Sequence, residues 1–423
     1  MLETMYRRAS KLKTTKYVPF ENIKGKNKCI EVYHILSEEF DLTYGRSKYI
    51  AELANYLITQ GFNVIILHRM GKVIANLDIF SEVYRLGSET TSSFKLKGKT
   101  CELIGHLPNP FTVFISFFKL LKYVRRKTEC QKIIHVHDIS SSFIIGLTVG
   151  KLYGIPVILH IHGFPVKEQF INITHTKSRF TRVVWFLTKM LHHVAVKILS
   201  KSASPIAYVI VNNNEVQSFY EKYGVDYKKI RVIPSAISLE DFENKLLPRD
   251  FVVKILGTTS PEEFVIGYVG RLAPEKNLVT LLQAFNRFIN SNPEARVKLV
   301  LVGDGPLKSL LINLISRYRL RRHVILAGRI PNAFRLLKGI DVFVLPSFSE
   351  GSPVSLLEAM AAERAIIASN IPAIREIVED GEEALLFNPH NHQQLENLIF
   401  TLYNNPKLRE KLGENARRKA KQY

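Results

Sequence analysis

The chain has 423 residues, of which 46% are hydrophobic and 23% are charged. This length predicts two or three domains with well-filled cores, and the composition excludes a disordered chain, a collagen-like repeat and a disulfide scaffold. Three cysteines, Cys29, Cys101 and Cys130, are far apart and form no Cys-x-x-Cys zinc or redox motif. This spacing predicts a reducing compartment.

The net charge is +21, and it is unevenly distributed. Residues 1–250 carry 36 basic and 21 acidic side chains, whereas residues 251–423 carry 23 and 17. Such an excess attracts an anionic partner: nucleic acid, a phosphorylated substrate or an acidic lipid. Composition does not choose among these three.

Residues 1–28 are basic and lack the apolar stretch of a signal peptide. The longest apolar run, residues 111–121, is too short to cross a bilayer. The sequence therefore predicts a cytoplasmic protein with a solvated basic tail over residues 1–28. A regulatory or membrane-touching arm is the alternative for this tail.

Short β-branched runs alternate with longer amphipathic stretches, which indicates parallel sheets covered on both faces. The first series of predicted strands comprises residues 29–36, 63–68, 132–138, 156–162 and 206–212, and the second comprises residues 264–270, 297–303, 323–328, 342–346 and 365–369. A break near residues 245–263 separates the series. We therefore predict an α/β protein with two doubly wound domains, residues 29–250 and 251–423. Ligands of such sheets bind at the carboxyl ends of the strands, which predicts a site in the cleft between the domains.

The most informative segment is residues 342–362, VFVLPSFSEGSPVSLLEAMAA. Ser352 and Pro353 predict the N-cap and first-turn proline of a helix, whose free N–H groups and dipole form an anion site. Glu350 before the helix and Glu358 within it predict a ligand that is both phosphate and polyol. Taken alone, the segment is better explained as a turn followed by a solvated helix glutamate.

A second segment, residues 264–277, reads FVIGYVGRLAPEKN and places Arg271 and Lys276 after a strand. A fork-shaped guanidinium and a compact ammonium suit a diphosphate, and Gly270 lets the backbone approach it. A surface salt-bridge pair at a helix start is the alternative. Residues 299–306, LVLVGDGP, form a third strand-to-loop turn, where the glycines fit a tight turn equally well.

In order and spacing, GYVGRLAPEKN, LVLVGDGP, PSFSEGSPVSLLEAMAA and EIVEDGEEALLF resemble the C-terminal domain of family-four retaining glycosyltransferases of GT-B fold. The match covers residues 264–388. The N-terminal half is similar to that family through YGRSKYIAELANYLITQGFNVIIL, IIHVHD, PVILHIHG and IRVIPSAISLEDF. The resemblance implies two Rossmann-like domains facing across a cleft and transfer of a sugar from a nucleotide-sugar donor. The alternative is a catalytically inactive GT-B partner subunit or a sugar-nucleotide-binding protein.

The resemblance also implies a role for each matching residue. Arg271 and Lys276 would bind the diphosphate, and Glu358 the ribose hydroxyls. Glu350 would hold sugar hydroxyls, and His162 would lie beside the reacting sugar. Further donor contacts would come from Gly45 near the phosphates, Arg329 and Ile330 beside the base, and Gly270, Gly351, Ser352, Pro353, Val354, Ser355 and Leu356.

The match departs from the family pattern at three places. Tyr44–Gly45 stands where two glycines are usual, Ser235–Ala236 where Asn-Gly is usual, and Pro372–Ala373 where two glycines are usual. None of these changes removes a charged donor ligand.

The nine aspartates form no Asp-x-Asp pair, the hard-oxygen site that would hold Mg²⁺ or Mn²⁺. The charge of the leaving group would then be neutralised by Arg271, Lys276 and the helix start. We therefore expect no cofactor and metal-independent transfer. The resemblance implies attack by the acceptor from the leaving-group face, which needs no protein nucleophile.

Three His-x-His pairs, 135/137, 160/162 and 390/392, raise zinc as an alternative. Residues two apart on a strand share a face, so the first two pairs can converge on neighbouring strands. Without a supporting cysteine or carboxylate cluster, we expect no metal and one member of each pair packed in the core or lining the cleft.

Residues 178–201 predict a helix with a basic face that carries Trp185. Such a face suits an anionic membrane surface, and a helix docked on its own domain explains it equally well. We expect the basic N-terminal domain to recruit a peripheral enzyme to a membrane that bears a lipid-linked or glycan acceptor.

Nucleic acid is not an expected partner, because no aromatic-studded basic strand or reading-helix motif is present. Paired acid/base carboxylates of an epimerase and a pyridoxal-binding lysine of a phosphorylase are also not found.

Overall fold

The computed structural model describes residues 29–39, 49–69, 91–106, 120–163, 197, 205–255 and 263–423, apart from residues 51–52, 55, 58–59, 61, 97–98, 123, 127, 140 and 238. The predictions for the tail (residues 1–28), for Gly45 and for the basic helix (residues 178–201, apart from Lys197) fall outside the described residues. Among the described residues, no helix has the length and apolar character to span a bilayer.

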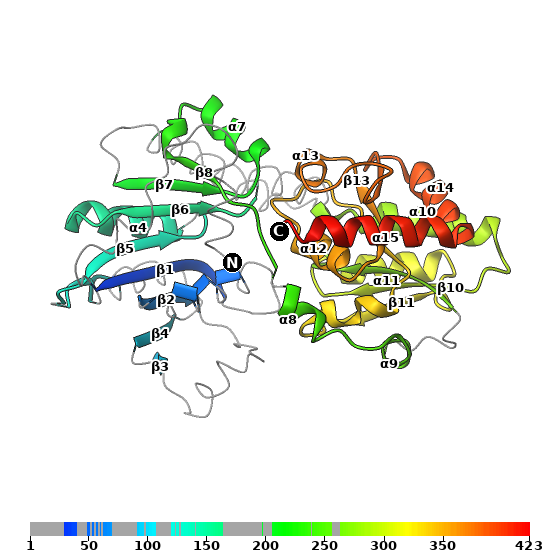
Figure 1. Cartoon of the computed structure of the whole chain (residues 1–423), viewed down its shortest axis with the longest axis horizontal. Coiled ribbons are helices and arrows are strands. Elements are labelled where there is room, and N and C mark those ends of the chain that lie inside the picture. The colour runs from blue at the N-terminus through cyan, green and yellow to red at the C-terminus, as the bar shows by residue number, and fades with distance from the viewer. Residues whose placement is uncertain are drawn as a thin grey trace. The chain divides into compact units, whose positions relative to one another are not determined.

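The chain forms two α/β units, each built on one twisted sheet with helices packed against it (Figure 1). The described residues up to Pro234 form the first unit, and Ser235 to Tyr423 form the second. The domain boundary predicted from the sequence lies after Asp250 instead. The difference arises because Phe242 and Val252 are buried in the core of the second unit.

The first unit contains an eight-stranded sheet of order β3-β4-β2-β1-β5-β6-β7-β8. Its strands are β1 (Ile30–Glu39), β2 (Asn63–Arg69), β3 (Thr91–Leu96), β4 (Lys99–His106), β5 (Gln131–Val136), β6 (Val157–Ile161), β7 (Ile206–Val211) and β8 (Ile230–Val232). Its elements outside the sheet include α4 (Ser141–Tyr153), α7 (Asn214–Lys222) and η3 (Tyr227–Lys229). All neighbouring strands are parallel except β3 and β4.

The second unit contains a six-stranded sheet of order β11-β10-β9-β12-β13-β14, and all its neighbours are parallel. Its strands are β9 (Phe264–Val269), β10 (Val297–Val302), β11 (Val324–Gly328), β12 (Val342–Leu345), β13 (Ala365–Ser369) and β14 (Leu385–Phe387). Its helices are α8 (Leu239–Glu243), α9 (Arg249–Ile255), η4 (Pro274–Lys276), α10 (Leu278–Ser291), α11 (Lys308–Arg317), η5 (Ala333–Gly339), α12 (Val354–Ala361), α13 (Pro372–Arg375), α14 (His392–Asn404) and α15 (Pro406–Ala420).

The ten strands predicted from apolar runs are all confirmed, with small shifts at their ends. Four strands were missed. β3 and β4 form an antiparallel pair rich in lysine and hydroxyl residues, so they lack the continuous apolar run of a buried parallel strand. β8 and β14 have only three residues each, too few for a periodic signal.

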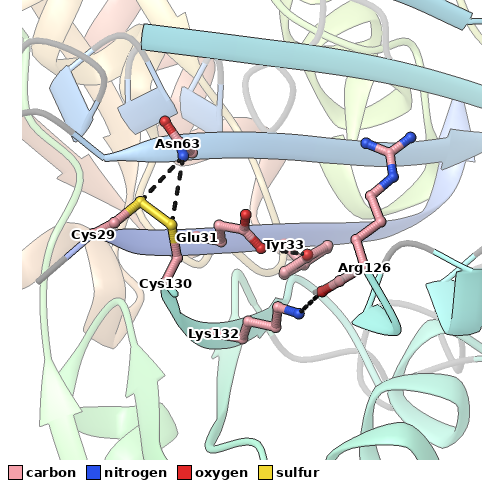
Figure 2. Close-up of a disulfide and its surroundings, with 7 residues drawn as sticks. All are labelled: Cys29, Glu31, Tyr33, Asn63, Arg126, Cys130 and Lys132. Atoms are coloured by element: carbon pink, nitrogen blue, oxygen red, sulfur yellow. Dashed lines mark hydrogen bonds between the residues drawn. A yellow bond between two sulfur atoms is a disulfide. The ribbon is translucent and has the colours of Figure 1, made fainter. Parts of the chain in front are cut away.

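A disulfide joins Cys29 and Cys130, which precede β1 and β5 (Figure 2). The two strands are parallel neighbours, and the Gln131 amide donates to the Cys29 carbonyl at 2.8 Å, so the thiols start side by side. The Asn63 side chain, at the start of β2, donates to the Cys29 sulfur at 3.3 Å. Disulfides persist in oxidising environments, so this pair contradicts the reducing compartment inferred from cysteine spacing.

Replacing both bonded cysteines, Cys29→Ser with Cys130→Ser, is expected to lower the free energy of unfolding by about 2–5 kcal/mol, because the bond closes a long loop in the unfolded chain. Urea unfolding measures this loss, and Cys101→Ser is the matched control. Protein purified without reductant should show one titratable thiol after unfolding. Three thiols would contradict the pairing.

Candidate functional site

The residues predicted to hold the donor lie at the carboxyl ends of β9 and β12. These strands are parallel neighbours, so the loops that follow them emerge at the same edge of the sheet. The loop after β9 carries Arg271 and runs into η4, which ends at Lys276. The loop after β12 carries Glu350 and runs into α12. The Phe348 amide donates to the Glu275 carbonyl at 2.8 Å and ties the two loops together.

Lys276 and Glu350 form the central contact of this site. The Lys276 Nζ lies 2.8 Å from each carboxylate oxygen of Glu350. The Ser347 hydroxyl also donates to Glu350 Oε1, at 2.6 Å. Glu350 is 7% exposed, so its charge is balanced almost entirely by these partners. The structure therefore brings together two residues that lie 74 positions apart in the sequence.

Arg271 has its own carboxylate partner, Glu275, with which it forms an ion pair one helical turn apart. The Glu275 side chain is 1% exposed, whereas that of Arg271 is 46% exposed. A buried carboxylate thus anchors a guanidinium side chain that is itself about half exposed. Glu275 was not predicted from the sequence, although its place four residues after Arg271 is the spacing of a helical ion pair.

Tyr268, on β9, fixes the backbone beneath Arg271. Its buried hydroxyl donates to the Arg271 carbonyl at 2.8 Å. Burial raises the pKa of Tyr268 well above 10, the carboxylates of Glu350 and Glu275 raise it further, and Arg271 opposes them. Tyr268 therefore stays a neutral donor. A Cβ on Gly270 (φ +157°) would lie 2.7 Å from this hydroxyl, so packing against Tyr268 by itself requires the glycine.

The turn after β10 supports the same loop from the other side. A Cβ on Gly303 (φ +147°) would lie 1.9 Å from the Gly270 carbonyl oxygen, and one on Gly305 (φ +155°) would lie 2.6 Å from that of Leu272. The Leu272 amide donates to the Asp304 carbonyl at 2.9 Å. The glycines of LVLVGDGP therefore permit a close backbone approach that holds the Arg271 loop in place.

The start of α12 differs from the prediction in its cap. The N-cap is Pro353, and no side chain caps the helix. The Ser352 hydroxyl, predicted to cap it, instead accepts a hydrogen bond from the Ser235 amide at 2.9 Å. The Leu356 amide donates to the Pro353 carbonyl at 3.0 Å. The amides of Val354 and Ser355 are left as the candidate ligand donors at this positive helix end.

The other predicted donor residues lie around these loops. Glu358 is on α12 and 8% exposed. Gly351 is buried, and Arg329 and Ile330 follow β11 and are half-buried. Asn277, which the sequence analysis missed, adopts a left-handed conformation (φ 55°). Its side chain donates to the carbonyls of Pro346 and Pro389, at 3.0 and 2.7 Å, so it joins three loops at this edge.

The first two His-x-His pairs converge in the first unit, as their strand spacing predicts. The rings of His135 and His137 lie 4.2 Å apart between centroids, and those of His160 and His162 lie 4.0 Å apart. β5 and β6 are parallel neighbours. A fifth ring, His34, is in register with His135 on β1 and was missed, because an isolated histidine in a strand carries no sequence signal.

These rings are mostly buried and neutral. Burial, with repulsion from His160, lowers the pKa of His34 to about 3. Burial and neighbouring rings lower the pKa values of His135 and His137 well below 6.5. One member of each His-x-His pair was expected to be packed or to line the cleft. In the second pair His160 is buried and His162 is half-buried, whereas both members of the first pair are buried. In the third pair His390 is exposed and His392 is half-buried, so neither is packed in the core.

Two groups of rings have nitrogens close enough to be considered for a metal: His34, His135 and His137, and His137, His160 and His162. The Nδ1 of His34 lies 2.8 Å from Nε2 of His137, whose Nδ1 lies 3.1 Å from Nε2 of His162. These are hydrogen-bond distances, whereas two ligands of a tetrahedral zinc stand about 3.3 Å apart. Neither group contains a carboxylate or thiolate to offset a buried double charge.

Comparison with known proteins covers both units. Residues 45–241 match the family described as Glycosyltransferase Family 4, and residues 257–419 match Glycosyl transferases group 1. A UDP-Gal:alpha-D-GlcNAc-diphosphoundecaprenol alpha-1,3-galactosyltransferase of Escherichia coli is 30% identical over 61% of this chain and 61% of its own length. The alpha-monoglucosyldiacylglycerol synthase of Acholeplasma laidlawii is 28% identical over 72% of this chain and 76% of its own.

Solved structures share the fold. Anabaena HepE, crystallised in complex with UDP, is 17% identical with a TM-score of 0.67, over 93% of this chain and 95% of that one. Sucrose-phosphate synthase of Thermosynechococcus elongatus is 18% identical with a TM-score of 0.70, over 93% and 94%.

The chain therefore belongs to the group 1, family 4 glycosyltransferases of GT-B fold, and the predicted resemblance and fold class are confirmed. Its match to the galactosyltransferase spans 61% of that protein's length.

Gly303→Ala should disrupt the Arg271 loop, because its Cβ would meet a backbone carbonyl at 1.9 Å. We expect the free energy of unfolding to fall by about 3 kcal/mol or more, and nucleotide affinity to fall with it. Gly328→Ala is the control: φ is +70° but nothing lies within 4 Å of the added atom, so the cost should be about 1–2 kcal/mol from backbone strain alone. Equal losses in urea unfolding would contradict the close approach.

Proposed function

We propose that the protein is a retaining glycosyltransferase that moves a sugar from a nucleotide-sugar donor to a hydroxyl of a lipid-linked or glycan acceptor at a membrane surface, without a divalent ion. The observation that carries this proposal is the Lys276–Glu350 contact beside the start of α12. An ammonium, a carboxylate and the amides at the start of α12 lie together at one edge of a parallel sheet. Ligands of this fold class bind at that edge.

The charges of this site suit a sugar that carries a diphosphate. Arg271, Lys276 and the amides of Val354 and Ser355 supply positive charge. Glu350 and Glu358 supply acceptors for hydroxyl hydrogens. An ammonium has three donors and no fixed fork, so Lys276 can turn toward a phosphate oxygen while it keeps one contact to Glu350. The site thus offers cations for the phosphates and carboxylates for the sugar and ribose.

In the proposed reaction, the bond between the sugar C1 and the phosphate oxygen breaks, and its electron pair stays on the nucleoside diphosphate. Arg271, Lys276 and the α12 amides stabilise that developing charge, the main catalytic contribution. The acceptor oxygen bonds to C1 from the face the diphosphate leaves, and its proton passes to the departing phosphate oxygen. The configuration at C1 is therefore retained.

The proposed acceptor is supported by the charge of the N-terminal half and by the names of relatives. Residues 1–250 carry most of the net positive charge, which favours an anionic surface. The relatives from Escherichia coli and Acholeplasma laidlawii are named for a polyprenyl diphosphate-linked sugar and for a glucosyldiacylglycerol. Both names describe lipids, which supports a lipid-linked acceptor and a peripheral enzyme at a membrane surface.

The direct test offers the protein a panel of UDP-, GDP- and ADP-sugars, with polyprenyl diphosphate-linked sugars or diacylglycerol in neutral or acidic vesicles. We expect transfer from one donor class that continues in EDTA, is faster on acidic vesicles, and gives a product with the donor's anomeric configuration by NMR. Donor binding without transfer to any acceptor would favour the inactive partner subunit. Inversion, or loss of transfer in EDTA, would contradict the mechanism.

A paired substitution tests the central contact without leaving a buried charge unpaired. Lys276→Met with Glu350→Gln should keep the fold and lower kcat/KM for the donor about 100-fold, because both the phosphate cation and the sugar carboxylate are lost. Arg287→Met with Glu396→Gln removes an ion pair between α10 and α14 and is the matched control. Unchanged kcat/KM in the first variant, with normal thermal unfolding, would rule out this site.

A further inference from the structure

Three imidazoles of the first unit form a continuous chain of hydrogen bonds. His34 Nδ1 lies 2.8 Å from His137 Nε2, and His137 Nδ1 lies 3.1 Å from His162 Nε2. The chain begins at the fully buried His34 on β1 and reaches the half-buried His162, directly after β6. Side chains on or directly after three parallel strands, β1, β5 and β6, therefore link His162 to the interior of the sheet.

The buried end of the chain sets the direction of its hydrogen bonds. The low pKa values of His34 and His137 mean that each ring is neutral and carries one N–H. The Nε2 of His34 is buried and has no hydrogen-bond partner among the described residues. An orphaned N–H is rarer and costlier than an unused lone pair, so the His34 proton belongs on Nδ1. His34 then donates to His137, and His137 donates to His162.

We propose that His34 and His137 are positioning residues that fix His162 as the tautomer with its proton on Nδ1. This inference deepens the proposed function, on which the role of His162 beside the reacting sugar rests. His162 Nε2 is occupied by the His137 N–H, so Nδ1–H is the ring's hydrogen-bond donor. His162 then donates to a sugar hydroxyl and cannot act as a general base, because neither nitrogen offers a lone pair to the substrate.

Ring stacking fixes the orientation of the same side chain. His162 stacks on His137 at 5.4 Å and on His160 at 4.0 Å, and Tyr49 packs edge-on against it. His160 is itself held, because its Nε2–H donates to Asn212 Oδ1 at 2.8 Å. The chain and the stack together leave the His162 ring one orientation and one tautomer.

The test compares two substitutions of nearly equal size. In His137→Asn the amide stands near the position of Nδ1, so it can still donate to His162. In His137→Gln the amide stands near the position of Nε2, so it faces His34 instead. If His137 has a purely structural role, both variants should lose the same activity. If the hydrogen-bond chain fixes the tautomer of His162, only His137→Gln should let His162 change tautomer.

The first measurement is the tautomer of His162, read from ¹⁵N spectra of ring-labelled histidine and assigned with His162→Gln. We expect the proton on Nδ1 in the original protein and in His137→Asn, and a mixture of tautomers in His137→Gln. A proton on Nε2 of His162 in the original protein overturns the proposal. So does a stoichiometric zinc ion that survives dialysis and shifts the ring nitrogens of His34, His135 and His137.

The second measurement is kinetic. His137→Gln should lower kcat about 10-fold with little change in the donor KM, and His137→Asn should recover most of that loss. Equal losses in both variants overturn the positioning role. The tautomer is measured without substrate, so it does not depend on sugar transfer. If the spectrum is as expected but the protein transfers no sugar, the proposed function is contradicted and the hydrogen-bond chain still stands.

Discussion

A buried carboxylate must keep a cation beside it, and this constraint organises the second unit. Glu350 and Glu275 are 7% and 1% exposed, and each is matched by one cation, Lys276 or Arg271. Removing one partner of such a pair typically costs about 3–5 kcal/mol. The loops after β9 and β12 are therefore locked to each other by charge as well as by the Phe348–Glu275 hydrogen bond.

The same constraint makes the site selective. The four side chains sum to zero charge, so the site does not collect every passing anion, despite the protein's net charge of +21. A ligand that draws each cation away from its carboxylate must offer that cation an anionic oxygen in exchange. It must also offer hydrogen-bond donors to the carboxylate. A sugar diphosphate does both, since phosphate oxygens meet the cations and hydroxyls meet the carboxylates. A simple phosphate does only the first.

Sequence reasoning recovered the parts of this site that repeat a local pattern. Apolar runs located the strands, and the family resemblance assigned Lys276 and Glu350 to the same donor. The strand order of the structure then explains their contact, because parallel neighbours end at one edge. Tyr268, Glu275 and Asn277 were not predicted from the sequence. Their roles depend on burial and on backbone carbonyls from other loops, which no local pattern encodes. The cap of α12 was wrong for the same reason: the hydroxyl of Ser352 is used by Ser235, 117 positions away.

The first unit handles its polar groups in the opposite way, through neutral rings rather than paired charges. Five histidines meet on β1, β5 and β6 or directly after β5 and β6. Burial lowers the pKa values of His34, His135 and His137 so far that these rings carry no charge at neutral pH. A neutral imidazole needs only one donor and one acceptor, so a chain of rings can cross the sheet without a counter-ion.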